Sequence, residues 1–110
     1  MMKLAVSAAA AGLLRALLFR VVTDRDRILL SNFRSTDWNS LTFAGERHEI
    51  SLRVTGAGAP ELVKRLTDNL DEAEFTIPGQ IVADITLAGA PAVQPDGTML
   101  VKIEALTVAE

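Results

Sequence analysis

The sequence predicts an α+β fold in which two helices cover one face of a four-stranded, mostly antiparallel sheet. Residues 47–55 alternate polar and apolar side chains with a period of two, as a half-buried strand does. Residues 13–22 and 62–70 carry apolar side chains at helical spacing. Two further apolar runs, 80–88 and 99–108, complete the order α-β-β-α-β-β, for which a two-layer sandwich is the simplest packing.

Length and composition limit the class of protein. The 110 residues fit a single domain, 1–110, and are enough for one hydrophobic core. A content of 49% hydrophobic and 23% charged residues is typical of a globular chain. The absence of cysteine excludes disulfides and thiolate chemistry and fits a reducing compartment. The net charge of −3 argues against a nucleic-acid partner.

Charge is divided unevenly along the chain. Residues 1–55 hold eight Lys/Arg against five Asp/Glu, whereas residues 56–110 hold three against nine. This division gives either two differently charged surfaces or a self-complementarity that helps two copies associate.

The opening segment, residues 1–22, has three interpretations. Lys3 and the apolar run that follows it fit a secretion signal. A membrane anchor needs about 20 apolar residues without central charge, and Arg15 and Arg20 interrupt the run. The third interpretation is favoured by a helical apolar stripe: a core or interface helix over about 4–22. We therefore expect a cytoplasmic protein without a membrane partner, with export through residues 1–22 as the minor alternative.

Residues 28–43 are expected to be extended, and residues about 33–43 to pair with residues 47–55. The sequence "FAGE" before the second strand predicts the hairpin turn, with Gly45 free to adopt a positive φ. The second strand turns the following side chains toward the core: His48, Ile50, Leu52 and Val54.

The register of this hairpin has two solutions. A two-residue turn places Leu41 opposite His48 and leaves Trp38 on the polar side. A three-residue turn, with a bulge near "STDW", places Trp38 opposite Leu52 in the core. We favour the second because a buried tryptophan removes a large apolar area from water.

The remaining elements follow from pattern and turn chemistry. Pro60 suits the first turn of a helix, whose apolar stripe is Leu62, Val63, Leu66 and Leu70. The strand at 80–88 is expected to point these side chains inward: Ile81, Ala83, Ile85 and Leu87. The strand at 99–108 does so with Met99, Val101, Ile103 and Ala105. Its other face also carries Leu100, Leu106 and Val108, which indicates a surface for a partner.

Four residues are candidate ligand-binding residues of a pocket between the sheet and the first helix. His48 is the only histidine and has Glu46 and Glu49 nearby for general base chemistry; otherwise it is a structural histidine at the sheet margin with one hydrogen bond. The others are Trp38, Asp37 and Asp84. Asp84 lies mid-strand and either pairs across the sheet with Arg53 or Lys102 or is desolvated by a second subunit.

Other motifs indicate no chemistry. "GAGAPE" resembles a phosphate-binding loop, but Glu61 places a carboxylate where an anion would bind. The acidic cluster Asp71, Glu72 and Glu74 lacks the calcium-loop pattern and is expected to be a solvated turn. We assign no catalytic residue and expect no metal and no cofactor.

The segments "DWNSLTFAGERHEISL" (37–52), "EAEFTIPGQIVADI" (72–85) and "IEALTVAE" (103–110) resemble a group of small uncharacterised bacterial proteins. The resemblance implies a bacterial cytoplasmic protein and carries no activity. We expect a non-enzymatic module that forms homo-oligomers, most simply a dimer, or binds another protein. The alternative is a small-molecule-binding protein or enzyme that uses the pocket.

Overall fold

The structure is a computed structural model that describes residues 6–110. Its elements, in chain order, are α1 (Ala8–Phe19), the 3-10 helix η1 (Val22–Arg27), β1 (Ile28–Asn39), β2 (Ala44–Val54), α2 (Ala59–Thr67), the 3-10 helix η2 (Leu70–Glu72), β3 (Gln80–Leu87), β4 (Ala92–Val93) and β5 (Met99–Ala109). The predicted α+β class is confirmed. The predicted count of four strands is wrong, because the short β4 also pairs with β5.

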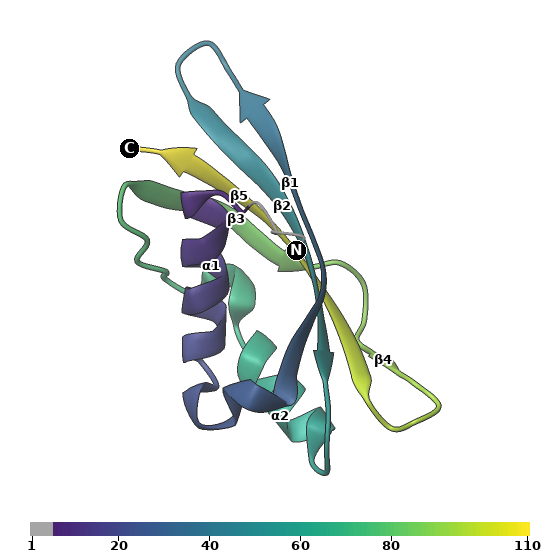
Figure 1. Cartoon of the computed structure of the whole chain (residues 1–110). Helices are drawn as coiled ribbons and strands as arrows, with labels where there is room; N and C mark the ends of the chain where they lie inside the picture. Colours follow the sequence, from purple (N-terminus) through teal and green to yellow (C-terminus); the bar gives the residue numbers. More distant parts are fainter. Residues whose placement is uncertain (1–5) are drawn as a thin grey trace, which may run out of the picture.

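The sheet is antiparallel throughout, with the order β1-β2-β5-β3 and with β4 beside β5. β5 therefore lies in the interior of the sheet, while β1 and β3 lie toward its edges. Figure 1 shows α1 and α2 on the same side of the sheet, and the turn of the β1–β2 hairpin projecting beyond α1.

One hydrophobic core joins the helices to the sheet. Alternate residues of β2 and β5 meet the apolar stripes of both helices. Fully buried members include Leu13, Leu17, Leu62, Leu66, Ile50, Leu52, Val54, Val101 and Ile103. Burying a leucine or isoleucine side chain stabilises a fold by about 1.5–3 kcal/mol, so this cluster is the main source of stability.

The helices follow the predicted pattern with shorter limits. α1 begins after Ser7, whose hydroxyl accepts a hydrogen bond from the backbone N–H of Ala10 at 3.1 Å. It ends at Phe19, before the β-branched Val21 and Val22, and not at residue 22. Residues 4 and 5 of the predicted helix lie outside the described residues. None of the helices within 6–110 is long and apolar enough to cross a membrane.

The predicted apolar stripe of the second helix is buried: Leu62, Val63 and Leu66 lie on α2, and Pro60 is in its first turn. The fourth residue, Leu70, is buried as well but belongs to η2, because α2 ends at Thr67. The chain enters this helix through Gly58, whose φ of +77° is left-handed and favours glycine.

The predicted turn of the β1–β2 hairpin is wrong. The turn is formed by residues 40–43, in which the backbone N–H of Ser40 donates to the carbonyl of Phe43 at 2.8 Å. The Ser40 hydroxyl accepts from the Phe43 N–H at 3.1 Å. Gly45 instead lies within β2, where a side chain would collide with the carbonyl oxygen of Thr107 on β5. Gly45 thus permits a close approach of two strands and does not make the turn.

Both predicted registers are therefore wrong as well. His48 pairs with Ser35, Leu52 pairs with Leu30, and Trp38 pairs with Gly45. Alternation along β1 places Trp38 on the face opposite His48, where its side chain is half-buried. A bulge does interrupt β1, but it lies at Ser31 and not near Trp38.

A second bulge, at Ala83, divides β3. After the bulge the prediction holds, since Ile85 is buried and Leu87 packs against the core. Before the bulge the inward-facing and outward-facing positions are exchanged, so Ile81 is 51% exposed and Val82 packs inward instead. The inward positions of Ile81 and Ala83 were thus wrong. The four predicted inward residues of β5 are all buried.

Candidate functional site

His48 is the only buried titratable side chain among the described residues, and it lies near the middle of the sheet. Its exposed fraction is 0%. Its Nδ1 lies 2.7 Å from the hydroxyl of Ser35, and its Nε2 lies 2.8 Å from the hydroxyl of Thr107. β1 supplies Ser35 as the register partner of His48, and β5 supplies Thr107. Both ring nitrogens therefore have a hydrogen-bond partner. His48 is also more buried than a structural histidine at the sheet margin would be.

The environment keeps this imidazole neutral near pH 7. Burial lowers the pKa of His48, and the nearby Glu46 carboxylate only partly opposes that effect. A neutral imidazole has one N–H donor and one acceptor. In one tautomer Ser35 donates to Nδ1 and Nε2–H donates to Thr107; in the other both bonds are reversed. The first tautomer is the arrangement of a hydroxyl next to a general base.

The four predicted site residues do not line one pocket. His48 and Asp37 lie on the face of the sheet that carries the core, and Asp37 is exposed opposite Glu46. Trp38 and Asp84 lie on the outer face, and Asp84 is exposed opposite Leu106. The partners that do reach His48, namely Ser35 and Thr107, were missed because their proximity depends on the register.

A cavity of about 460 Å³ lies elsewhere, between the second half of α1 and residues 73–76. Its walls include Ala16, Phe19 and Phe75. The Arg20 guanidinium lies 5.9 Å from the centroid of the Phe75 ring and donates from Nη2 to the carbonyl of Asp68. Arg20 therefore holds the end of α1 to the end of α2. Arg20 and Glu74 both line the cavity, so its two charged groups are of opposite sign.

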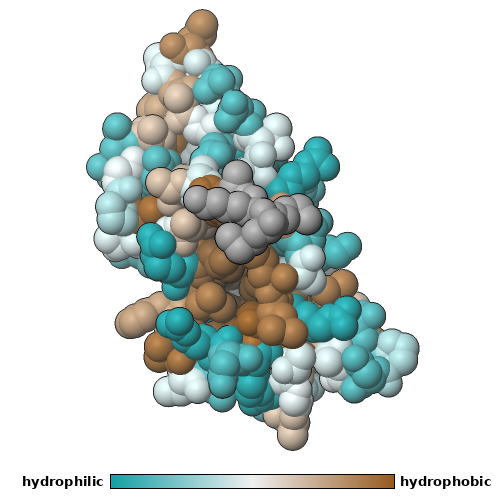
Figure 2. Space-filling model, viewed as in Figure 1, coloured by the Kyte–Doolittle hydropathy of each residue, from teal (hydrophilic) through white to brown (hydrophobic). Residues whose placement is uncertain are grey.

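Large apolar side chains are exposed at the two ends of the β1–β2 hairpin, and Trp38, near the turn, is half-buried. We call these residues the hairpin surface: Leu29, Leu30, Trp38, Leu41 and Phe43. Leu29 is 52% exposed, Phe43 is 56% exposed and Leu41 is fully exposed. Figure 2 shows hydrophobic residues at the projecting end of the molecule and a broad hydrophobic area near its middle.

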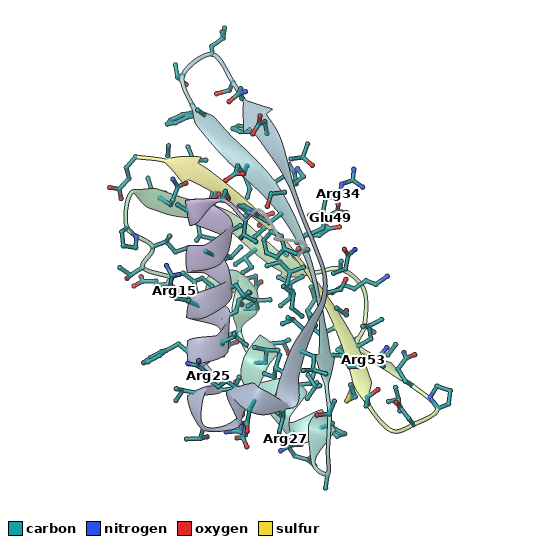
Figure 3. The ribbon with its side chains drawn as sticks, in the orientation of Figure 1. Arg15, Arg25, Arg27, Arg34, Glu49 and Arg53 are labelled. Carbon is teal, nitrogen blue, oxygen red and sulfur yellow. The ribbon has the colours of Figure 1, made fainter. Side chains whose placement is uncertain are left out.

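Charged groups surround the middle of the hairpin. Figure 3 shows Arg34 and Glu49 side by side, with Arg34 Nε 3.5 Å from Glu49 Oε2. Arg27, in contrast, binds the backbone that follows β2. Its Nε donates to the carbonyl of Thr55 at 2.9 Å, and its Nη2 donates to the carbonyl of Ala57. Within residues 6–110 no group of three or more His, Asp or Glu side chains could hold a metal ion.

No protein-family model matches the chain, and the comparison with curated proteins finds no match. A functional assignment therefore depends on the geometry of the two features above, the His48 centre and the hairpin surface.

Proposed function

We propose that this chain is a non-enzymatic module that associates with another protein chain through the hairpin surface. The observation that carries the proposal is the exposure of Leu41 and Phe43 together at the end of the hairpin. Contiguous exposed apolar residues mark interaction sites in soluble proteins. The proposal takes the fold as a two-layer sandwich in the order α-β-β-α-β-β, located in the cytoplasm of a bacterium, with a homodimer as its simplest assembly.

Burial of these residues provides a driving force for association. Each Å² of apolar surface removed from water contributes roughly 25 cal/mol. Leu41 and Phe43 make no contribution to the core cluster, so they can be covered by a partner without loss of any packing within the chain. The turn also projects beyond α1, where a partner can reach it (Figure 1).

The test is the mass of the protein in solution over a wide range of concentration. We expect the wild type to assemble and the double variant Leu41→Ser, Phe43→Ser to remain monomeric in sedimentation velocity. Val93→Ser is the matched control, because Val93 is 69% exposed but lies on β4. A wild type that stays monomeric at all concentrations contradicts self-association.

A second candidate function, a small enzyme, is favoured by the 2.7 Å contact between Ser35 and a neutral His48. Ser35 is exposed whereas His48 is not, so a substrate would meet the serine hydroxyl first. An activated hydroxyl would be acylated by p-nitrophenyl acetate. Release of nitrophenolate that is lost in Ser35→Ala but kept in Ser31→Ala supports this candidate, and equal rates in both variants exclude it.

A further inference from the structure

The outer edge of β1 has no partner within residues 6–110, because β2 pairs with β1 on one side only. β1 is 12 residues long, and its stretch from Asn32 to Asn39 is regular, between the bulge at Ser31 and the turn. A long edge strand presents a row of backbone N–H and C=O groups that can pair with another chain. Proteins shorten or cover such edges when pairing is to be avoided.

The sequence of β1 makes this edge complementary to itself. Leu29 and Leu30 lie at its start, Trp38 lies near its end, and Leu41 and Phe43 follow in the turn. Polar residues occupy the middle. When two copies of such a strand pair in antiparallel orientation, the start of one lies beside the end of the other. The apolar ends would then cover each other, and the polar middles would pair.

Geometry restricts the register of such a pair. A two-fold axis perpendicular to the sheet keeps the core-bearing faces of both copies on the same side of the joined sheet. Such an axis must pass beside a residue of β1 that lies opposite the same residue of the second copy. An axis at Arg34 would place the two Arg34 guanidinium groups opposite each other, which is unfavourable because like charges repel. An axis at Ser35 opposes Asp37 with the Phe33 of the second copy, which leaves a carboxylate beside an aromatic ring.

An axis at Thr36 avoids both of these conflicts. Arg34 lies opposite Trp38 of the second copy, a cation–π pair on the outer face. Ser35 lies opposite Asp37 of the second copy, so its hydroxyl can donate to a carboxylate on the inner face. Leu41, in the turn of one copy, lies just beyond the paired segment, toward the start of β1 of the other, whereas Phe43 lies beside Ser40 on the β2 side of the hairpin. The paired segment, 33–39, also avoids the bulge at Ser31.

We infer that the partner of this module is a second copy of the same chain, paired antiparallel through β1 about a two-fold axis at Thr36. The inference rests on the association function proposed above and specifies its partner and register. The two sheets would join into one continuous sheet, with the hairpin surfaces of both copies at the junction. The charged residues Arg34 and Asp37 in the middle of β1 disfavour a lipid surface as the occupant.

The chain contains no cysteine, so one introduced thiol reports the register. Residues directly opposite in an antiparallel pair have Cβ atoms about 4.5–5.5 Å apart, and diagonal neighbours about 7–8 Å apart. A disulfide requires Cβ atoms about 3.5–4.5 Å apart, which only the opposite position approaches. Thr36→Cys is therefore expected to form a covalent dimer in mild oxidant, and Arg34→Cys and Ser35→Cys are expected to form little.

Thr86→Cys, on the opposite edge strand β3, is the matched control for random collision of thiols. Each variant is first measured in reductant, where it should show the wild-type far-ultraviolet spectrum and the wild-type mass distribution. The single Trp38 gives an independent readout, because pairing buries its ring and shifts its emission to shorter wavelength with rising protein concentration.

The outcomes separate this inference from the function on which it rests. Assembly of the wild type with preferential cross-linking at Thr36→Cys supports both. Assembly with cross-linking at Thr36→Cys no faster than at Thr86→Cys overturns β1 pairing and leaves self-association intact, and preference for Ser35→Cys overturns the register. A wild type that remains monomeric, with unchanged Trp38 emission, overturns the inference and self-association together.

Discussion

β1 and β2 form one hairpin, yet they differ in almost every physical respect. On the core-bearing face, β2 buries His48, Ile50, Leu52 and Val54 completely or nearly so. Opposite them, β1 leaves Ser35 exposed and Leu30 37% exposed. β2 has a strand on both sides, whereas β1 has one neighbour in the described chain. Position in the sheet, and not alternation alone, thus decides how much a strand buries.

The largest effect is expected where β2 meets β5. Gly45→Val would place a branched side chain against the carbonyl oxygen of Thr107, so either the strands separate or the chain fails to fold. We expect a loss of about 4 kcal/mol or more in the free energy of unfolding, measured by urea denaturation. The neighbouring exposed residue gives the control, Ala44→Val, which should change stability by less than about 0.5 kcal/mol. Equal stability of the two variants would show that β5 does not approach β2 so closely.

A cross-strand pair tests the comparison directly. Leu52 is fully buried, and its register partner Leu30 is not. Leu52→Ala should lower the free energy of unfolding by about 2–5 kcal/mol. Leu30→Ala should lower it by less than about 1.5 kcal/mol, since much of that side chain already contacts water. The measurement is made at low protein concentration, where self-association is minimal. Similar losses in both variants would mean that β1 is as buried as β2.

Acid is expected to destabilise the folded state through His48. Because burial lowers the pKa of His48 in the folded state, the unfolded chain binds a proton more readily as the pH falls through about 6.5. The folded state should therefore lose stability as the pH falls from 7 through the unfolded pKa toward the lower, folded pKa. Chemical denaturation at a series of pH values measures this slope.

His48→Gln is the control for the acid effect, since its side chain cannot titrate. It should flatten the pH dependence in this range while it lowers the stability at neutral pH. A wild-type slope that persists in His48→Gln would assign the acid sensitivity to carboxylates instead.

The smallest effect is expected on the outer face. The side chains of Arg34 and Glu49 are 72% and 54% exposed at a separation of 3.5 Å. Exposed ion pairs contribute about 0–1 kcal/mol, so Arg34→Ala should change the free energy of unfolding of the monomer by less than about 0.5 kcal/mol. It should nevertheless weaken the dimer, because it removes the cation opposite Trp38. An equal effect on folding and assembly would argue against the Thr36 register.

The parts of the fold that the sequence predicted are those with dense local patterns. The stripe of α2 and the alternation of β2 each repeat several times within one element, so no long-range information is needed to place them. The register of the hairpin could not be found in this way. It depends on Gly45, whose role is set by Thr107 on a strand more than sixty residues away in sequence.

The candidate site was predictable only in its central residue. His48 stands out as the single histidine, but its contact with Thr107 exists only because β2 and β5 are neighbours. Ala83 illustrates the same limit. A bulge at this residue exchanges the inward-facing and outward-facing positions before it, and nothing in the local sequence pattern predicts the bulge. Trp38 was expected in the core because of its size, yet the register places it on the face of the sheet opposite the two α-helices.

The order of the strands also has a consequence for synthesis. β5 joins β2 to β3, but it is the last of the five strands to leave the ribosome. Until residues 99–109 emerge, the apolar face of β2 has no β5 beside it, and the nascent chain must be kept from pairing with its neighbours on the polysome. Folding of this sheet is therefore expected to be a late event that follows translation of β5.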